Sequence, residues 1–568
     1  MLKKLIILAL FGLLAPLAFA EAKFRLRPPL WVDRDDHDIP EPKEREVSEI
    51  FAILYNSWLR HLNPEYKVLL AKDAGALNVT AWDEVPDSTW FTNRMGRRSL
   101  SFQEILEGLK GEAPQPGRWR IIRINDEGYT PKFDISDEAS NRYVLKFDLP
   151  SALERNSGAE RICTLIMHAA GYNVPLNTIV YFSPETLYLD HDSYYRDPVG
   201  KRRPMTQMDL DNGLNKLKSL PDGRYRGLAS LFLPGKPVGR FVYRGRRKDD
   251  PNDLIPHELR RELRGLRVIA SWINHVDVKD VNALDMYVTA PDGRRFVKHC
   301  FIDFGSTMGS GDFVNGPYRL GHEYIFDGPA MARAFITLGF WERPWDVRGE
   351  IRHQEIGYYE AESFEPEKWK PNYPNLAFER MDDADAYWGA KIVTAFTDEV
   401  VHELAAAGDY SRPEVTRYLE EVLKKRRDAI GHHWLDRITP LEKLILEAGE
   451  TNYRLRFRDL ALERGYADAN SRVYRLWAQD SKGRNLISKT ELKAENGVLE
   501  LSKLAMPTPT ASKALPDPYG RVPLLRLFVQ SNRQAGGWAL PIEVIIGSGP
   551  NSSSIAVLGW SHGVRVEK

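Results

Sequence analysis

The chain has 568 residues, of which 43% are hydrophobic and 28% charged, so it is long enough for several domains and can bury a large core. Lys plus Arg and Asp plus Glu number 79 each, which excludes a chain-wide basic field, and we expect no nucleic-acid partner. The two cysteines, Cys163 and Cys300, exclude a disulfide framework and a cysteine-rich zinc site. We expect both to be buried free thiols.

Residues 1–20, "MLKKLIILALFGLLAPLAFA", combine two lysines, an apolar run and a small-x-small cleavage signature at Ala18-Phe19-Ala20. This pattern predicts a secretory signal peptide and export to a periplasm or the cell exterior. The alternative is an N-terminal membrane anchor, although the apolar run is short and interrupted by Pro16. No later stretch approaches the length of a membrane span, so we expect none after signal removal.

Residues 21–115 form an expected N-terminal extension. It begins extended and acidic, and apolar residues recur at helical spacing in "REVSEIFAILYNSWLRHL", residues 45–62. The Pro- and Gly-rich stretch "GEAPQPGRW" ends this segment and indicates a domain boundary.

Residues 116–245 are rich in predicted strands. The runs "RWRIIRIND", "PKFDI" and "NRYVLKFDLP" favour an antiparallel meander, because turn residues separate their β-branched and aromatic positions. An amphipathic helix follows in "GAERICTLIMHAAGYNVP", with Gly171 expected just after its C-terminus. Further strands are expected at "GLASLFLP" and "VGRFVY".

Residues 246–450 are predicted to be mostly helical, apart from one hairpin. Residues 451–568 change to short alternating runs such as "VYRLWAQ" and "PIEVIIG", which predict a separate β-sandwich-like domain. The whole chain is therefore expected to have an α+β fold.

The stretch "SWINHVDVKDVNALDMYV", residues 271–288, contains the pattern H-x-D-x-K-x-x-N, with Asp277, Lys279 and Asn282. A hairpin folded at residues 291–293, "PDG", returns the chain through "RRFVKHCFIDFG" and brings Asp303 near Asp277 and Asn282. Two carboxylates and an amide from adjacent loops suit a site that binds magnesium and phosphate.

"HVDVKDVN" resembles the catalytic loop of the protein-kinase-like superfamily, and "IDFG" resembles its metal-binding turn. The resemblance implies that Asp277 is the catalytic base and that Lys279 contacts the transferring phosphate. It also implies that Asn282 and Asp303 hold the metal ion, and that an antiparallel-sheet small lobe (116–245) precedes a helical large lobe (246–450).

The superfamily also has a strand lysine that pairs with a glutamate on the following helix. "YVLKFD" supplies Lys146 and the helix that begins near residue 158 supplies Glu160, in the expected order. Glu154, which precedes that helix, is the competing partner for Lys146.

The chain departs from the protein-kinase pattern in two places. No G-x-G-x-x-G precedes Lys146, so the turn around Gly128 and Thr130 is the nearest candidate to cover the nucleotide phosphates. The A-P-E ending of the activation segment is also missing. The chain is therefore more similar to divergent branches, namely the HipA-type, spore-coat and secretory-pathway kinases.

This resemblance implies an exported phosphotransferase that uses ATP with Mg²⁺ or Mn²⁺ and acts on a protein or small-molecule hydroxyl. Two alternatives stay open, namely a non-catalytic pseudokinase scaffold and adenylyl transfer on the same fold. The sequence carries no signal of oligomeric state.

"GWSHG", residues 559–563, matches the G-x-S-x-G nucleophile elbow literally. A hydrolase needs a following helix and later Asp and His partners, but only "VRVEK" remains. We therefore expect an edge-strand turn there.

Overall fold

The computed structural model describes residues 34–64, 66, 75–125, 130–196, 201–311, 319–343, 345, 351–448, 452–480, 483–501, 522–548 and 555–565. The predicted signal peptide lies outside these residues. The described residues divide into two compact units, one of residues 34–78 and 85–435 and one of residues 79–84 and 436–565.

The larger unit is a mixed α/β structure. Its strands are β1 (Trp119–Asn125), β2 (Lys132–Ser136), β3 (Arg142–Lys146), β4 (Asn177–Phe182), β5 (Leu187–Tyr188), β6 (Tyr194–Arg196), β7 (Arg202–Pro204), β8 (Tyr225–Leu231), β9 (Lys236–Pro237), β10 (Ala283–Thr289) and β11 (Arg295–Phe301). Its helices are α2 (Glu49–Ser57), α4 (Phe102–Gly108), α5 (Arg155–Ala170), α6 (Gln207–Asn215), α7 (Arg261–Trp272), α8 (Gly328–Ile336), α9 (Leu376–Glu379), α10 (Asp383–Val393), α11 (Asp398–Ala406) and α12 (Pro413–Arg437), with the 3-10 turns η2 (Leu59–Leu62), η3 (Pro184–Thr186), η4 (His257–Leu259) and η5 (Asp280–Asn282).

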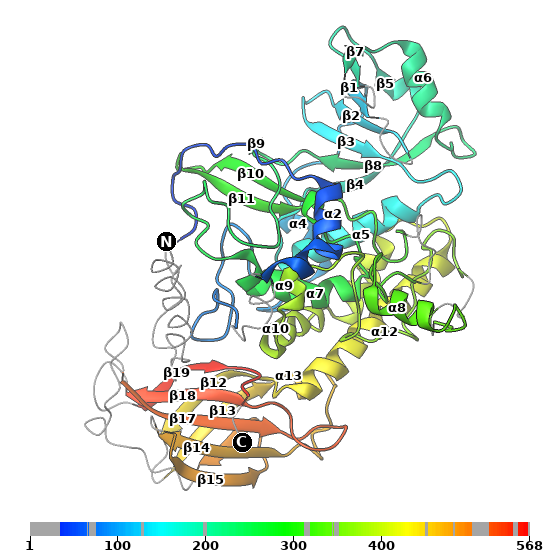
Figure 1. Cartoon of the computed structure of the whole chain (residues 1–568). Helices are drawn as coiled ribbons and strands as arrows, with labels where there is room; N and C mark the ends of the chain where they lie inside the picture. Colours follow the sequence, from blue (N-terminus) through cyan, green and yellow to red (C-terminus); the bar gives the residue numbers. More distant parts are fainter. Residues whose placement is uncertain are drawn as a thin grey trace, which may run out of the picture. The chain divides into compact units, whose positions relative to one another are not determined.

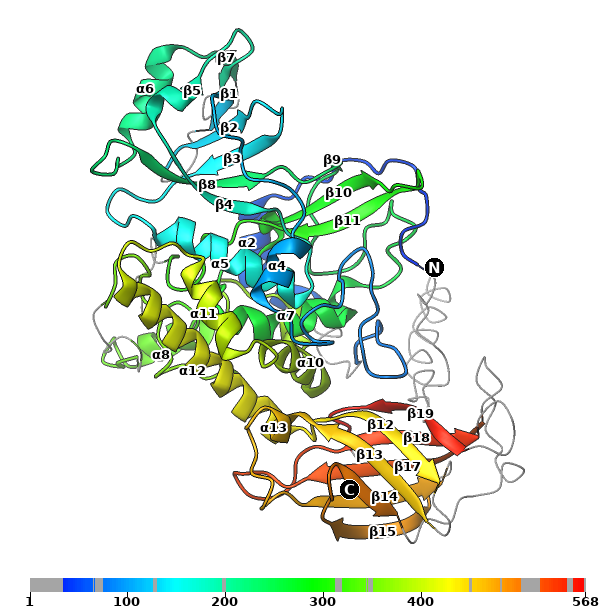
Figure 2. The same cartoon turned by 180° about the vertical axis from the view of Figure 1, so that it is seen from behind.

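An eight-stranded sheet has the order β4-β8-β3-β2-β1-β6-β7, with β5 beside β1. Strands β1, β2 and β3 pair antiparallel in sequence, so the predicted meander is confirmed. Alternate side chains of these strands, such as Phe133 and Leu145, are fully buried and form one hydrophobic core. Figures 1 and 2 both show α5 next to β4 and β8.

Helix α5 is fixed at both ends. The Asp148 carboxylate accepts hydrogen bonds from the amide and hydroxyl of Ser157 in the first turn, at 2.8 and 2.7 Å. Gly171 ends the helix with a φ of 127°, as its position in the sequence predicts. A Cβ at Gly171 would lie 2.7 Å from the carbonyl oxygen of Thr92, so the packing also requires glycine.

The predicted hairpin is confirmed, because β10 and β11 pair antiparallel from Ala283↔Phe301 to Thr289↔Arg295. The strand expected at "VGRFVY", residues 238–243, is wrong, since the adjacent strand β9 ends at Pro237. Phe241 and Tyr243 are buried all the same. A buried irregular segment has the same apolar content as a strand, and the pattern does not separate the two.

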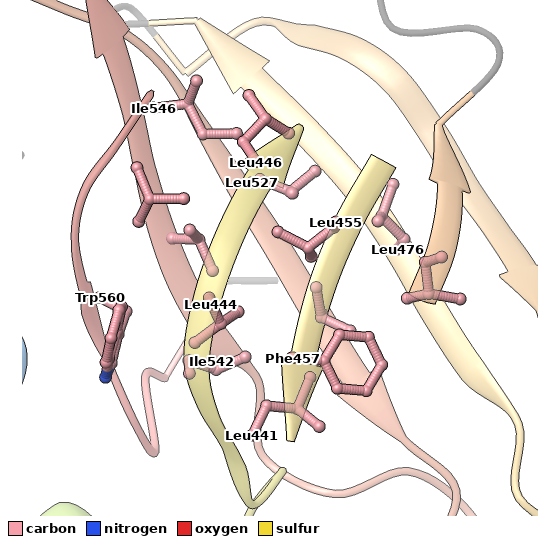
Figure 3. Close-up of a cluster of buried hydrophobic side chains, with 14 of the residues drawn as sticks. Leu441, Leu444, Leu446, Leu455, Phe457, Leu476, Leu527, Ile542, Ile546 and Trp560 are labelled. Atoms are coloured by element: carbon pink, nitrogen blue, oxygen red, sulfur yellow. The ribbon is translucent and has the colours of Figure 1, made fainter. Parts of the chain in front are cut away.

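The smaller unit contains two sheets, with the orders β12-β13-β16 and β15-β14-β17-β18-β19. Its elements are β12 (Leu441–Ala448), β13 (Tyr453–Asp459), α13 (Leu460–Glu463), β14 (Tyr474–Asp480), β15 (Asn485–Leu492), β16 (Val498–Leu501), β17 (Val522–Ser531), β18 (Ile542–Ser548) and β19 (Ile555–Ser561). Leucines of β12 and β13 interleave with apolar residues of β17 and β18 in one core (Figure 3).

Residues 79–84 belong to this unit although they are distant in sequence. Asp83 accepts hydrogen bonds from the His562 amide and contacts His562 Nδ1 at 3.0 Å, and both side chains are buried. Ser561 ends β19 and His562 is used in this contact, so the G-x-S-x-G match is a strand end as expected.

Both cysteines are free and buried, as predicted. In the described part of the chain, no helix combines the length and apolar character needed to cross a membrane.

Candidate functional site

Lys146 lies at the end of β3, and its ammonium bridges two carboxylates. Its Nζ donates to Glu160 Oε1 at 2.6 Å and to Asp303 Oδ1 at 3.2 Å. Burial alone would lower the pKa of Lys146, but the charges of Asp303 and Glu160 outweigh burial and raise it. The lysine is therefore cationic at every physiological pH.

Glu160 lies on α5 and is almost completely buried, with 3% of its side chain exposed. Burial raises the pKa of Glu160, and Lys146 opposes that change. Asn177 of β4 also donates to Glu160 Oε1, at 3.3 Å. Glu154, the competing partner, instead accepts a hydrogen bond from the amide of Ser411, so Lys146 pairs with Glu160.

The loop between α7 and β10 carries Asp277, Lys279 and Asn282. The Asn282 side-chain amide donates to Asp277 Oδ2 at 2.9 Å, and Lys279 Nζ lies 3.0 Å from Asp277 Oδ1. Burial raises the pKa of Asp277, although Lys279 and Asn282 act in the opposite direction. Both oxygens of the carboxylate are thus held in place by neighbours from its own loop.

Asp303 lies two residues after the end of β11 and has a φ of 63°, in the left-handed region. The amide of Ile302, one residue earlier, donates to the Asn282 carbonyl at 3.0 Å, which places the two loops side by side. The Lys146 ammonium lowers the pKa of Asp303, with a smaller contribution from Lys132. The Asp303 side chain is nevertheless 40% exposed, so a ligand can reach its oxygens.

His275, at the start of the H-x-D-x-K-x-x-N pattern, is buried and packs against Phe304, with ring centroids 5.5 Å apart. Burial lowers the pKa of His275 to about 4, so the imidazole is neutral at physiological pH. His275 thus joins the loop that carries Asp277 to the segment that follows Asp303.

The turn around Gly128 and Thr130 was expected to cover the nucleotide phosphates, and the structure describes one of these two residues. Gly128 lies outside the described residues. The Thr130 hydroxyl donates to the carbonyl of Phe147, the residue after Lys146, at 3.2 Å. Thr130 therefore contacts the backbone just after the end of β3.

Two further residues, which the sequence pattern did not single out, also reach the site. Lys132, the first residue of β2, places its Nζ 3.9 Å from Asp303 Oδ2. Glu49, the first residue of α2, accepts a hydrogen bond from Lys279 at 2.6 Å. Neither position belongs to a motif that the sequence shows. Both contacts join segments far apart in the sequence, so local sequence patterns could not predict them.

Asn282 and Asp303 suit a hard cation by their chemistry. In the described part of the chain, no group of three or more His, Cys, Asp or Glu side chains is arranged to hold a metal ion. A magnesium ion that binds with a nucleotide needs only one or two protein carboxylates, because the phosphates supply further ligands. Asn282 Oδ1 has no hydrogen-bond partner among the described residues, and an exposed oxygen of Asp303 lies in the neighbouring loop.

The sequence matches no protein-family model and no curated protein. Comparison with solved structures gives a different result. The chain is similar to kinases. The Golgi casein kinase shares 12% identity with a TM-score of 0.27, and the alignment covers 72% of this chain and 96% of that one. For the Helicobacter pylori proinflammatory kinase CtkA the values are 10% and 0.26, with coverages of 54% and 92%.

A second structure of the Golgi casein kinase, with Mn/ADP bound, shares 14% identity with a TM-score of 0.24, over 71% of this chain and 97% of that one. All three superpositions are loose. The description of the site therefore rests on the contacts of Lys146, Glu160 and Asp303 within the chain itself.

Proposed function

We propose that this protein is an exported, kinase-like phosphotransferase that moves the γ-phosphoryl group of ATP to the hydroxyl of a protein or small molecule. One observation carries the proposal. A single lysine joins a helix glutamate to an aspartate at a loop, and the Asp277–Asn282 pair lies in the adjacent loop. A structural ion pair would need neither the exposed Asp303 nor the second carboxylate.

The proposed layout has two lobes around this site. Lys146 and Glu160 come from the eight-stranded sheet and α5, which would form the small lobe. Asp277, Asn282 and Asp303 come from the loops that join α7, β10 and β11, which would belong to the large lobe. Catalytic groups from two lobes can be aligned or separated by a small rotation, a common means of control in such enzymes.

Asn282 and Asp303 would hold a divalent metal ion, and Lys146 would bind the nucleotide phosphates. When bound, the metal-nucleotide complex supplies the phosphoryl group and neutralises part of its charge. Asp277 would accept the hydrogen bond of the acceptor hydroxyl and orient its oxygen for attack. Its raised pKa leaves it a stronger base than an exposed aspartate.

Intact-mass spectrometry after incubation with ATP and Mg²⁺ or Mn²⁺ tests the reaction. We expect a phosphoryl-sized increment in the mature protein, and none in Asp277→Asn or Asp303→Asn. Asp277→Asn should still bind nucleotide, whereas Asp303→Asn should lose metal-dependent binding. Asp222→Asn is the matched control and should behave as the parent, because Asp222 is exposed and forms its ion pair with Arg224, outside the site.

The other outcomes point to the alternatives. An adenylyl-sized increment would replace phosphoryl transfer by nucleotidyl transfer. No increment, together with no thermal shift on adding metal and nucleotide, would contradict enzyme activity and leave a non-catalytic scaffold. Export is tested separately by cell fractionation and by sequencing the mature N-terminus, which should begin at Glu21.

A further inference from the structure

We propose that Lys132 is a second phosphate-binding lysine, which binds the β- or γ-phosphate of the nucleotide. The inference rests on the proposed function and adds a residue to the same site. It starts from a gap in the sequence: no glycine-rich loop with the pattern G-x-G-x-x-G precedes Lys146, so the backbone amides that such a loop turns toward phosphate are not provided by that motif.

The sheet register places Lys132 and Lys146 on the same face. Phe133 pairs with Leu145 across β2 and β3, so the next residues on these strands are Lys132 and Lys146. Opposed residues of an antiparallel pair project to one side of the sheet. Both ammonium groups accordingly approach one carboxylate, Lys146 at Oδ1 and Lys132 at Oδ2 of Asp303, at 3.2 and 3.9 Å.

Two cations opposite each other on one sheet face are unfavourable unless an anion lies between them, and here the single carboxylate of Asp303 is shared by both. Lys146 is satisfied by Glu160 and Asp303. Lys132 is not, because 3.9 Å is too long for a hydrogen bond and no other acceptor for its ammonium exists among the described residues. Its side chain is 39% exposed, so its ammonium, with three donors, is accessible to a ligand that binds at Asp303.

The chemistry that fits this arrangement is a polyphosphate. A lysine ammonium binds phosphate oxygens as a point charge, and two ammonium groups beside an exposed carboxylate suit a chain of phosphates with its metal ion. A nucleoside or a monophosphate would not extend to both lysines. Lys132 should therefore contribute to the affinity for ADP and ATP but not to that for AMP.

Calorimetric titration of the full chain with ADP and with AMP, in the presence of Mn²⁺, tests the inference. We expect Lys132→Gln to weaken ADP binding about tenfold, the usual effect of losing one charge-assisted hydrogen bond, and to leave AMP binding unchanged. Lys132→Arg should restore most of the affinity. The control is Lys236→Gln, a strand lysine of another sheet that pairs with Glu41.

Unchanged ADP affinity in Lys132→Gln would overturn the inference, and so would equal losses for ADP and AMP, which would indicate a structural role. Either result, in a parent protein that binds ADP, would refute this inference and leave the proposed function standing. A parent protein that binds neither nucleotide would refute the proposed function as well. Thermal unfolding without ligand should be the same for Lys132→Gln, Lys132→Arg, Lys236→Gln and the parent.

Discussion

At Lys279, one ammonium is shared by two carboxylates, Asp277 at 3.0 Å and Glu49 at 2.6 Å. The side chain of Glu49 is 47% exposed, so solvent screens its pair and the interaction contributes less than about 1 kcal/mol to stability. The resemblance to kinases predicts that Lys279 contacts the transferring phosphate. Glu49 competes for the donors that such a contact needs.

Glu49→Gln removes this competing charge. We expect the KM for ATP to fall by up to about fivefold, because Lys279 keeps its contact with Asp277 and gains a free donor. The free energy of unfolding should change by less than about 1 kcal/mol. Steady-state kinetics and thermal unfolding check the two parts, and an increased KM would show instead that Glu49 holds Lys279 in its working position.

Sequence pattern could predict some residues of the site and not others. Lys146, Glu160, Asp277, Asn282 and Asp303 stand in an order that a kinase-like chain requires, and the structure brings Lys146 and Glu160 together. The choice of Glu160 over Glu154 depends on where α5 begins, since Glu154 has a φ of 71° and turns toward Ser411. Lys132 and Glu49 follow no motif, because only folding brings them to the site.

Helices α7 and α10 cross through a pair of glycines. A Cβ at Gly265 would lie 2.6 Å from Trp388 and 3.0 Å from the Asp385 carbonyl, and a Cβ at Gly389 would lie 2.7 Å from the Gly265 carbonyl. Arg264 of α7 also binds the buried carboxylate of Asp385 in α10, at 3.2 Å. Close backbone contact and a buried ion pair thus hold α7, the helix that precedes the loop of Asp277, Lys279 and Asn282.

Gly265→Ala should be destabilising by about 2 kcal/mol, because a methyl group has no space at this crossing and Trp388 must move. Denaturant unfolding measures the change. Gly328→Ala is the control, since Gly328 also lies in a helix and an added Cβ there meets nothing within 4 Å. Equal stability of the two variants would contradict the proposed tight crossing.

Across the whole molecule, stability at acid pH depends on buried histidines and on buried aspartates. Burial lowers the pKa of His168 to about 3 and that of His275 to about 4, so both are neutral when folded. Burial raises the pKa of Asp280 to about 6 and that of Asp382 to about 7. These two acids bind a proton in the folded state first, so they favour the folded state as pH falls. The buried histidines destabilise the fold as pH falls below 6.5, while the buried acids partly offset them.

His168→Gln isolates one of these groups. A histidine whose pKa is lower in the folded state costs stability as pH falls, because the unfolded chain binds its proton first. At pH 7 the parent should be at least as stable as the variant. Its advantage should shrink by roughly 1 kcal/mol per pH unit between 6.5 and 4.5, as followed by denaturant unfolding. A difference that does not vary with pH would show that His168 is accessible to protons in the fold.

The local features could be predicted from the sequence: the antiparallel meander, the helix that ends at Gly171 and the hairpin before Asp303. These follow from side-chain periodicity and turn chemistry, which act over a few residues. The contacts between distant side chains emerge only from the fold, namely Lys132 with Asp303, Glu49 with Lys279 and Asp83 with His562. Electrostatic contacts act through space, and the distance along the chain does not reveal them.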